Sequence, residues 1–153
     1  MAMQFANVWE RVSDTVGDNI ALINGDKELS WSQLDVKAAK IATILEEYGL
    51  KSDSKVGIYL HNSNEYLEAQ YGVFKIEGVP INVNYRYKEN ELIYLLDNAD
   101  AEAVFFQGCY SERIKAIKDQ LPKIKVYIQI DDGTEPLMDG AIDYESSISS
   151  SKE

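Results

Sequence analysis

The sequence has very few of the side chains that bind metals or form cross-links. Its 153 residues include one cysteine, Cys109, and one histidine, His61. A single cysteine cannot form an intrachain disulfide, which is typical of a protein from a reducing compartment. This scarcity also excludes a structural zinc site built from Cys and His ligands. A Cys–His nucleophilic pair would have to join these two residues, and the sequence around neither of them resembles a catalytic motif.

Long apolar runs and glycine-rich loops are missing as well. No run of about 18 apolar residues is present, so we expect no transmembrane helix. Residues 1–8 lack the charged start and apolar run of a signal peptide, which predicts a cytoplasmic protein. The nine glycines are scattered, and they form neither a Gly-x-Gly-x-x-Gly fingerprint nor a Walker loop. No phosphate-binding loop of these kinds is therefore expected.

Acidic residues are in excess. The chain has 26 Asp and Glu against 15 Lys and Arg, a formal net charge of −11. Nucleic acids and anionic membranes would repel such a chain unless a basic patch compensated, and the sequence shows no basic patch. The composition is otherwise globular, with 45% hydrophobic and 27% charged residues. Length and composition together predict one folded domain with a sizeable core.

Strand and helix patterns alternate along the chain. A helix over 5–16 is followed by a hairpin, with strands 20–24 and 29–31 and a turn at Asn24-Gly25. Short apolar strands and amphipathic helices then take turns. The predicted strands cover 56–60, 79–83, 103–106 and 126–130, and the predicted helices cover 31–48, 62–77, 89–98 and 111–121. This order is typical of an α/β fold, a doubly wound and mostly parallel sheet with helices on both faces.

The last 23 residues differ from the rest. Residues 131–153 hold seven acids and one lysine, and serines crowd their end. We expect residues 1–130 to form the α/β unit and 131–153 to be a linker with a marginal helix at 144–148. The pair Asp131-Asp132 suggests either a metal site or a solvated acidic turn. The turn is favoured, because the pair follows the last strand, whereas response regulators carry an acidic pocket after an early one. A signalling receiver domain is disfavoured for the same reason.

Several segments resemble one enzyme family. The segment 29–34 reads Leu-Ser-Trp-Ser-Gln-Leu. It is similar to the Leu-Ser/Thr-Tyr-x-Glu-Leu motif near the start of AMP-forming acyl-CoA synthetases, which belong to the adenylate-forming superfamily. In this chain Trp31 replaces the Tyr of the motif and Gln33 replaces its Glu. The stretch 61–87 resembles the family's helix ending in Gly, its following strand and its Asn-x-Arg motif. Residues 5–10 and 91–101 match as well. The resemblance covers nearly the whole chain in order.

This resemblance implies an activity and its cofactors. The family joins a carboxylic or fatty acid to ATP with Mg²⁺, releases pyrophosphate, and passes the acyl group from the acyl-adenylate to coenzyme A; such an enzyme is an acid–thiol ligase. Family members are several times longer, and their phosphate loop would begin soon after Glu153. We therefore expect an incomplete N-terminal subdomain with no catalytic residue and no metal site, which binds no cofactor tightly and is inactive alone. The acyl pocket would lie mostly downstream.

One residue is a candidate for ligand binding. Arg86 follows the end of a predicted strand, where ligands collect in open α/β sheets. The resemblance implies that it contacts the nucleotide phosphate of coenzyme A, a role that suits a guanidinium. The alternative is an ion pair with Glu89 or Glu91. His61 could line the acyl or coenzyme A path, although a capping or surface role is favoured. Cys109 is expected to be a small buried or edge residue rather than a nucleophile.

Two further expectations concern partners. A stand-alone α/β binding or scaffold module without catalysis is the alternative to a ligase fragment. If the chain is a subdomain, the face that would pack on the next subdomain is exposed. We therefore expect self-association through an apolar patch.

Overall fold

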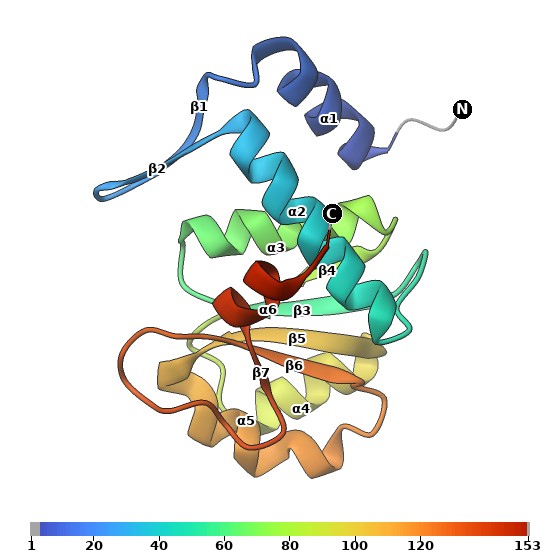
Figure 1. The fold of residues 1–153 in the computed structure, drawn as a ribbon. Helices are drawn as coiled ribbons and strands as arrows, with labels where there is room; N and C mark the ends of the chain where they lie inside the picture. Colours follow the sequence, from blue (N-terminus) through green and yellow to red (C-terminus); the bar gives the residue numbers. More distant parts are fainter. Residues whose placement is uncertain (1–3, 153) are drawn as a thin grey trace.

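The structure, a computed structural model, describes residues 4–152, and Figure 1 shows its elements. In chain order they are α1 (Phe5–Val16), β1 (Ile20–Asn24), β2 (Lys27–Ser30), α2 (Trp31–Glu47), β3 (Lys55–Tyr59), α3 (Asn64–Lys75), β4 (Val79–Asn82), α4 (Glu89–Asn98), β5 (Ala101–Gln107), η1 (Gly108–Tyr110), α5 (Ser111–Ile117), η2 (Lys118–Gln120), β6 (Val126–Ile130), β7 (Ile142–Asp143) and α6 (Tyr144–Ser150).

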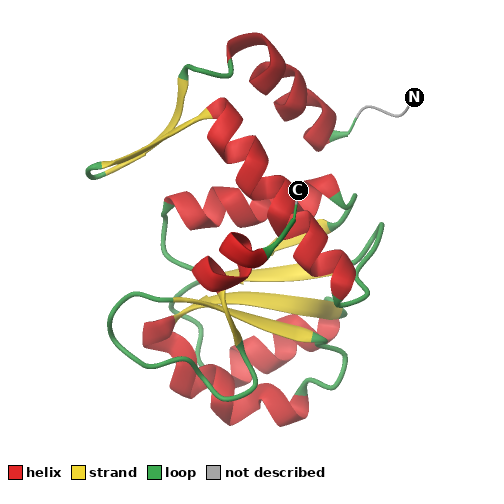
Figure 2. Cartoon of the chain, in the orientation of Figure 1, coloured by secondary structure: helices red, strands yellow, loops and turns green. Residues whose placement is uncertain are grey.

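A parallel sheet forms the centre of the fold. Its strands lie in the order β4-β3-β5-β6-β7, and β1 and β2 form a separate antiparallel hairpin. Helices α2, α3 and α6 cover one face of the sheet, and α4 and α5 cover the other (Figures 1 and 2). Each face has its own apolar core, around Phe105 on the first and Phe106 on the second. The predicted doubly wound α/β fold with an N-terminal hairpin is confirmed.

Local sequence signals account for the start and the buried face of α2. The Ser30 side chain accepts from the Gln33 backbone N–H at 3.2 Å, and the Gln33 side chain accepts from the Ser30 N–H at 2.9 Å. This capping box satisfies two backbone donors at the helix start, as the sequence predicts. Along the helix, Leu34, Ala38 and Ile41 recur at helical spacing and are buried. That stripe attaches α2 to the rest of the fold.

Two chain reversals differ in detail from the prediction. The hairpin turns at Gly25 and Asp26, because Asn24 pairs with Lys27. Gly25 takes the left-handed conformation there, with φ +60°. Helix α3 was expected to close at Gly78, but Glu77 adopts the left-handed conformation, with φ +58°, and the Gly78 N–H donates to the Val73 carbonyl. The left-handed residue that ends α3 is therefore Glu77, one residue before the glycine that the sequence pattern indicates.

The acidic C-terminal segment takes part in the fold. Strand β7 pairs with β6 in parallel, with Ile142 opposite Ile128. The predicted helix at 144–148 is present as α6, and its Tyr144 and Ile148 are buried in the core. The interpretation of 131–153 as a linker therefore does not hold for residues 142–150, which pack on the sheet and on α2. A domain boundary after residue 130 stays a prediction.

Candidate functional site

The candidate site lies where the parallel strands β3 and β5 end side by side. Helix α3, which follows β3, covers one face of the sheet, and α5, which follows β5, covers the other. The connections that follow β3 and β5 therefore run to opposite faces of the sheet. Open α/β sheets bind ligands between two such strand ends. His61 follows β3 here, and its backbone N–H donates to Oε1 of Gln107, the last residue of β5, at 2.5 Å.

Aromatic side chains line this edge. The Tyr59 and Tyr110 rings stack with centroids 4.4 Å apart. The Tyr110 hydroxyl lies 2.5 Å from Nε2 of His61, whose ring stands edge-on to Tyr85 at 4.8 Å. Burial raises the pKa of Tyr110 to about 12, so this phenol keeps its proton at neutral pH. His61 thus belongs to a connected aromatic cluster.

Arg113 on α5 ties this cluster to the loop after β4. Its guanidinium donates to the Tyr59 hydroxyl at 2.9 Å and to the Tyr87 carbonyl at 3.0 Å. The Tyr59 hydroxyl also donates to the Tyr87 carbonyl, at 2.7 Å, and burial raises the pKa of Tyr59, which keeps this donor protonated. The loop that carries Arg86 is therefore held from both β3 and α5.

The structure leaves the Arg86 charge without an acidic partner among residues 4–152. The side chain is exposed, and its guanidinium lies 5.7 Å from the centre of the Tyr85 ring. The alternative ion pair with Glu89 or Glu91 does not form, since every ion pair among the described residues involves a lysine. Glu91 instead accepts from the Lys88 backbone N–H at 2.7 Å. The Arg86 guanidinium is thus exposed and has no ion-pair partner among the described residues.

Cys109 and the pair Asp131-Asp132 lie beside the aromatic cluster, where they form hydrogen bonds within and next to a turn. Asp132 accepts from the Cys109 backbone N–H at 3.0 Å and from the Thr134 hydroxyl at 2.5 Å. Asp131 accepts from the Gly133 N–H at 2.8 Å. These bonds shape the turn after β6 and join it to the end of β5. Burial and the Asp132 carboxylate raise the pKa of the Cys109 thiol to about 11, which disfavours the thiolate that a nucleophile needs.

Sequence reasoning missed most members of this cluster. Gln107 ends β5, Tyr110 and Arg113 follow that strand, and Tyr59 ends β3. A usable signal exists, because the carboxyl ends of parallel strands meet at one edge, so polar residues just after two such strands can touch. The long side chain of Arg113 reaches the β4 loop only because β3 and β4 are neighbours, and local patterns do not record that neighbourhood.

Comparison with known proteins shows which protein family the chain belongs to. The family described as AMP-binding enzyme matches residues 8–151, and the chain belongs to this family. It is similar to a 3-oxocholest-4-en-26-oate–CoA ligase of Rhodococcus rhodochrous, with 37% identity in an alignment of 153 positions that covers 99% of this chain and 28% of the relative. A medium/long-chain-fatty-acid–CoA/3-oxocholest-4-en-26-oate–CoA ligase of Mycolicibacterium smegmatis is 38% identical over 135 residues, 88% of this chain and 24% of the relative. The chain thus spans about a quarter of the length of these relatives.

Solved structures agree on the fold. An anthranilate CoA ligase in complex with anthranoyl-AMP superimposes with a TM-score of 0.90 at 20% identity, over 97% of this chain and 28% of that one. A fatty acyl CoA synthetase of Mycobacterium tuberculosis gives a TM-score of 0.83 at 18% identity, again over 97% and 28%. Both likenesses place the described residues in the N-terminal portion of the adenylate-forming fold. Across residues 4–152, no helix combines the length and the apolar character needed to cross a membrane.

Proposed function

We propose that residues 1–153 are the N-terminal portion of an ATP-dependent, AMP-forming acyl-CoA ligase. Such an enzyme activates a carboxylic or fatty acid as its acyl-adenylate, with Mg-ATP, and transfers the acyl group to coenzyme A. The family match over residues 8–151, together with relatives that are CoA ligases, carries this proposal. The single cysteine suits a reducing compartment, and we place the activity in the cytoplasm.

We further propose that this portion supplies structure and one ligand contact, and that it is inactive alone. Adenylation places negative charge on phosphoryl oxygens, which needs positioned cations and backbone donors. The 153 residues hold no glycine-rich phosphate loop of the Walker or dinucleotide type. We therefore expect no ATP–pyrophosphate exchange from the purified 153-residue chain.

A chimera tests the proposed function directly. Residues 1–153 replace the matching portion of the Rhodococcus ligase, and that ligase without the portion is the control. The chimera should form AMP and acyl-CoA from the Rhodococcus enzyme's own acid, ATP and coenzyme A, whereas the control and the 153-residue chain should not. A folded chimera without this activity, or exchange by the 153-residue chain alone, would contradict the proposal.

Arg86 is proposed to bind the nucleotide phosphate of coenzyme A. In the chimera, Arg86→Ala should raise the apparent Michaelis constant for coenzyme A roughly tenfold and leave kcat unchanged, because a charged hydrogen bond of about 1.5 kcal/mol is lost. The same substitution should change little when 3′-dephospho-coenzyme A is the thiol. Lys88→Ala, which removes an exposed cation from the same loop, is the matched control. An unchanged Michaelis constant for coenzyme A in Arg86→Ala would show that Arg86 does not contact coenzyme A.

Self-association of the chain is proposed from its exposed apolar side chains. Phe5, Ile23 and Tyr94 are each about two-thirds exposed or more, at 69%, 68% and 73%. Contact between copies would remove such side chains from water. Sedimentation should show association that grows with concentration and with salt, because salt screens the repulsion of chains with a net charge of −11. A monomer under all of these conditions would contradict the proposal.

A further inference from the structure

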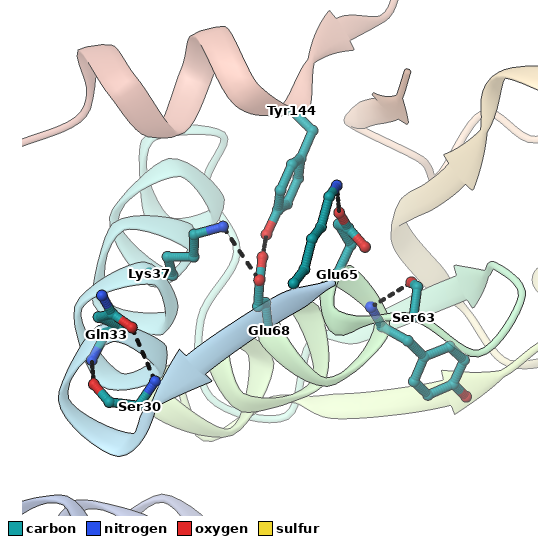
Figure 3. Close-up of polar contacts among 9 residues, drawn as sticks. Ser30, Gln33, Lys37, Ser63, Glu65, Glu68 and Tyr144 are labelled. Atoms are coloured by element: carbon teal, nitrogen blue, oxygen red, sulfur yellow. Dashed lines mark hydrogen bonds and ion pairs between the residues drawn. The ribbon is translucent and has the colours of Figure 1, made fainter. Parts of the chain in front are cut away.

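A buried carboxylate joins three helices on one face of the sheet. Glu68 on α3 is 1% exposed. Its Oε1 accepts from the Lys37 ammonium on α2 at 3.2 Å, and its Oε2 accepts from the Tyr144 hydroxyl on α6. Figure 3 shows Tyr144 and Lys37 converging on Glu68 from these two neighbouring helices. A buried charge is tolerated only where such partners satisfy it.

The element held by this contact has little stability of its own. Helix α6 has seven residues and strand β7 before it has two. A helix this short does not persist in water without tertiary contacts. The contacts that attach it to α2, α3 and the sheet include the Tyr144–Glu68 hydrogen bond, the buried Ile148 and an edge contact of Tyr144 with Phe105. Just after the helix, Ser151 donates a hydrogen bond to the Lys40 carbonyl at 3.5 Å. Of the two hydrogen bonds, the one from Tyr144 to Glu68 is buried, whereas the one from Ser151 is only partly buried.

We propose that Glu68 and Tyr144 form a proton-linked latch that holds α6, and with it the path of the chain through residues 142–151, against α2 and α3. In the closed state α6 and Tyr144 cover the Glu68 carboxylate. When α6 opens, the carboxylate meets water and the Tyr144 hydroxyl is released. Opening of the segment and the protonation of Glu68 are therefore coupled.

The direction of the coupling follows from burial. Burial raises the pKa of Glu68, and the Tyr144 hydroxyl and the Lys37 ammonium only partly oppose this rise. The other charged groups that act on the pair are Glu65 on α3, which is 3.9 Å from Lys27 of β2, and Glu145 on α6. The closed state thus binds the Glu68 proton more tightly than the open state does. Raising the pH through the elevated pKa therefore favours opening.

Hydrogen exchange of the 153-residue chain tests the latch. The opening constant of the α6 amides, corrected for intrinsic exchange, should rise with pH by up to about tenfold per pH unit. The rise should be confined to the window between the ordinary pKa of Glu, near 4.5, and the raised value. In Glu68→Gln this slope should vanish, because Gln accepts a hydrogen bond but does not titrate. The same slope in Glu68→Gln, or no slope in the native chain, would overturn the proposal.

A second pair of variants separates the latch from general loss of stability. Tyr144→Phe should speed exchange of the α6 amides roughly ten- to hundredfold, because a hydrogen bond to a charged group is lost, and should leave β3 and β5 protected. Tyr127→Phe is the matched control, since the buried Tyr127 hydroxyl has no hydrogen-bond partner among the described residues. An equal effect of Tyr144→Phe on α6 and on β3, or an effect no larger than that of Tyr127→Phe, would contradict the latch.

Discussion

Replacing Gly72 with alanine is expected to destabilise the protein by about 3 kcal/mol, at the upper end of the usual cost of overpacking a core. A Cβ at Gly72 would lie 2.3 Å from Cγ2 and 2.6 Å from Cβ of Ile41, and 3.2 Å from the Ala38 carbonyl oxygen. The nearest atoms thus lie at or close to the backbone of α2 and cannot swing aside. Helices α2 and α3 would have to separate, and urea unfolding monitored by circular dichroism measures the loss.

Gly57→Ala is the matched control for this prediction. Gly57 is also buried, and its added Cβ would lie 2.8 Å from Cδ2 of Leu96, the far end of a flexible side chain. A small rotation of Leu96 relieves that contact, so the expected cost is about 1 kcal/mol. If Gly57→Ala were the more damaging change, the close approach of α2 to α3 at Gly72 would not be the feature that limits packing.

Phe105→Ala is expected to cost about 3–5 kcal/mol, the usual range for removing a buried Phe side chain. Phe105 lies on β5, in the middle of the sheet order, is 1% exposed, and contacts the Tyr144 ring edge-on at 6.4 Å. The substitution removes apolar burial and leaves a cavity beneath α6. Thermal and denaturant unfolding measure the change, which is large relative to the whole stability of a domain of this size.

The same substitution at an exposed position tests whether burial is the cause. Phe5→Ala removes a ring that is 69% exposed and stacks on Phe74 at 5.0 Å. Its expected cost is below about 1 kcal/mol, because little apolar area returns to water. Similar losses for Phe105→Ala and Phe5→Ala would show that the face of the sheet beneath α6 adds no more stability than a surface contact.

Much of the fold could be predicted because its signals are local. The Ser30–Gln33 capping box spans three residues, and the stripe of Leu34, Ala38 and Ile41 follows the helical repeat. Apolar runs such as 126–130 are typical of buried parallel strands, and β6 has these bounds. Strand β7 was missed, because two residues carry no periodicity and Ile142 is ordered by its pairing with Ile128.

The candidate site was only partly predictable, for a similar reason. Arg86 was found from its place after a strand and from the family resemblance. Its neighbours Tyr59 and Arg113 lie 54 positions apart in sequence, and the order β4-β3-β5 brings them together. The Glu68–Tyr144 contact joins residues separated by 76 positions. No local pattern marks Glu68 as buried, since it is a charged residue on an amphipathic helix.

By itself, the sequence determined the class of the protein: an acidic α/β chain with one cysteine, one histidine and the motifs of AMP-forming acyl-CoA synthetases. Propensity, periodicity and capping act over a few residues, and they are legible without the fold. The tertiary structure alone decided which charges are paired and which are free. It placed Arg86 beside Tyr85 without a carboxylate among the described residues, and it buried Glu68 under Tyr144. Burial and long-range contact set the energy of a charge, and both arise only when distant segments pack together.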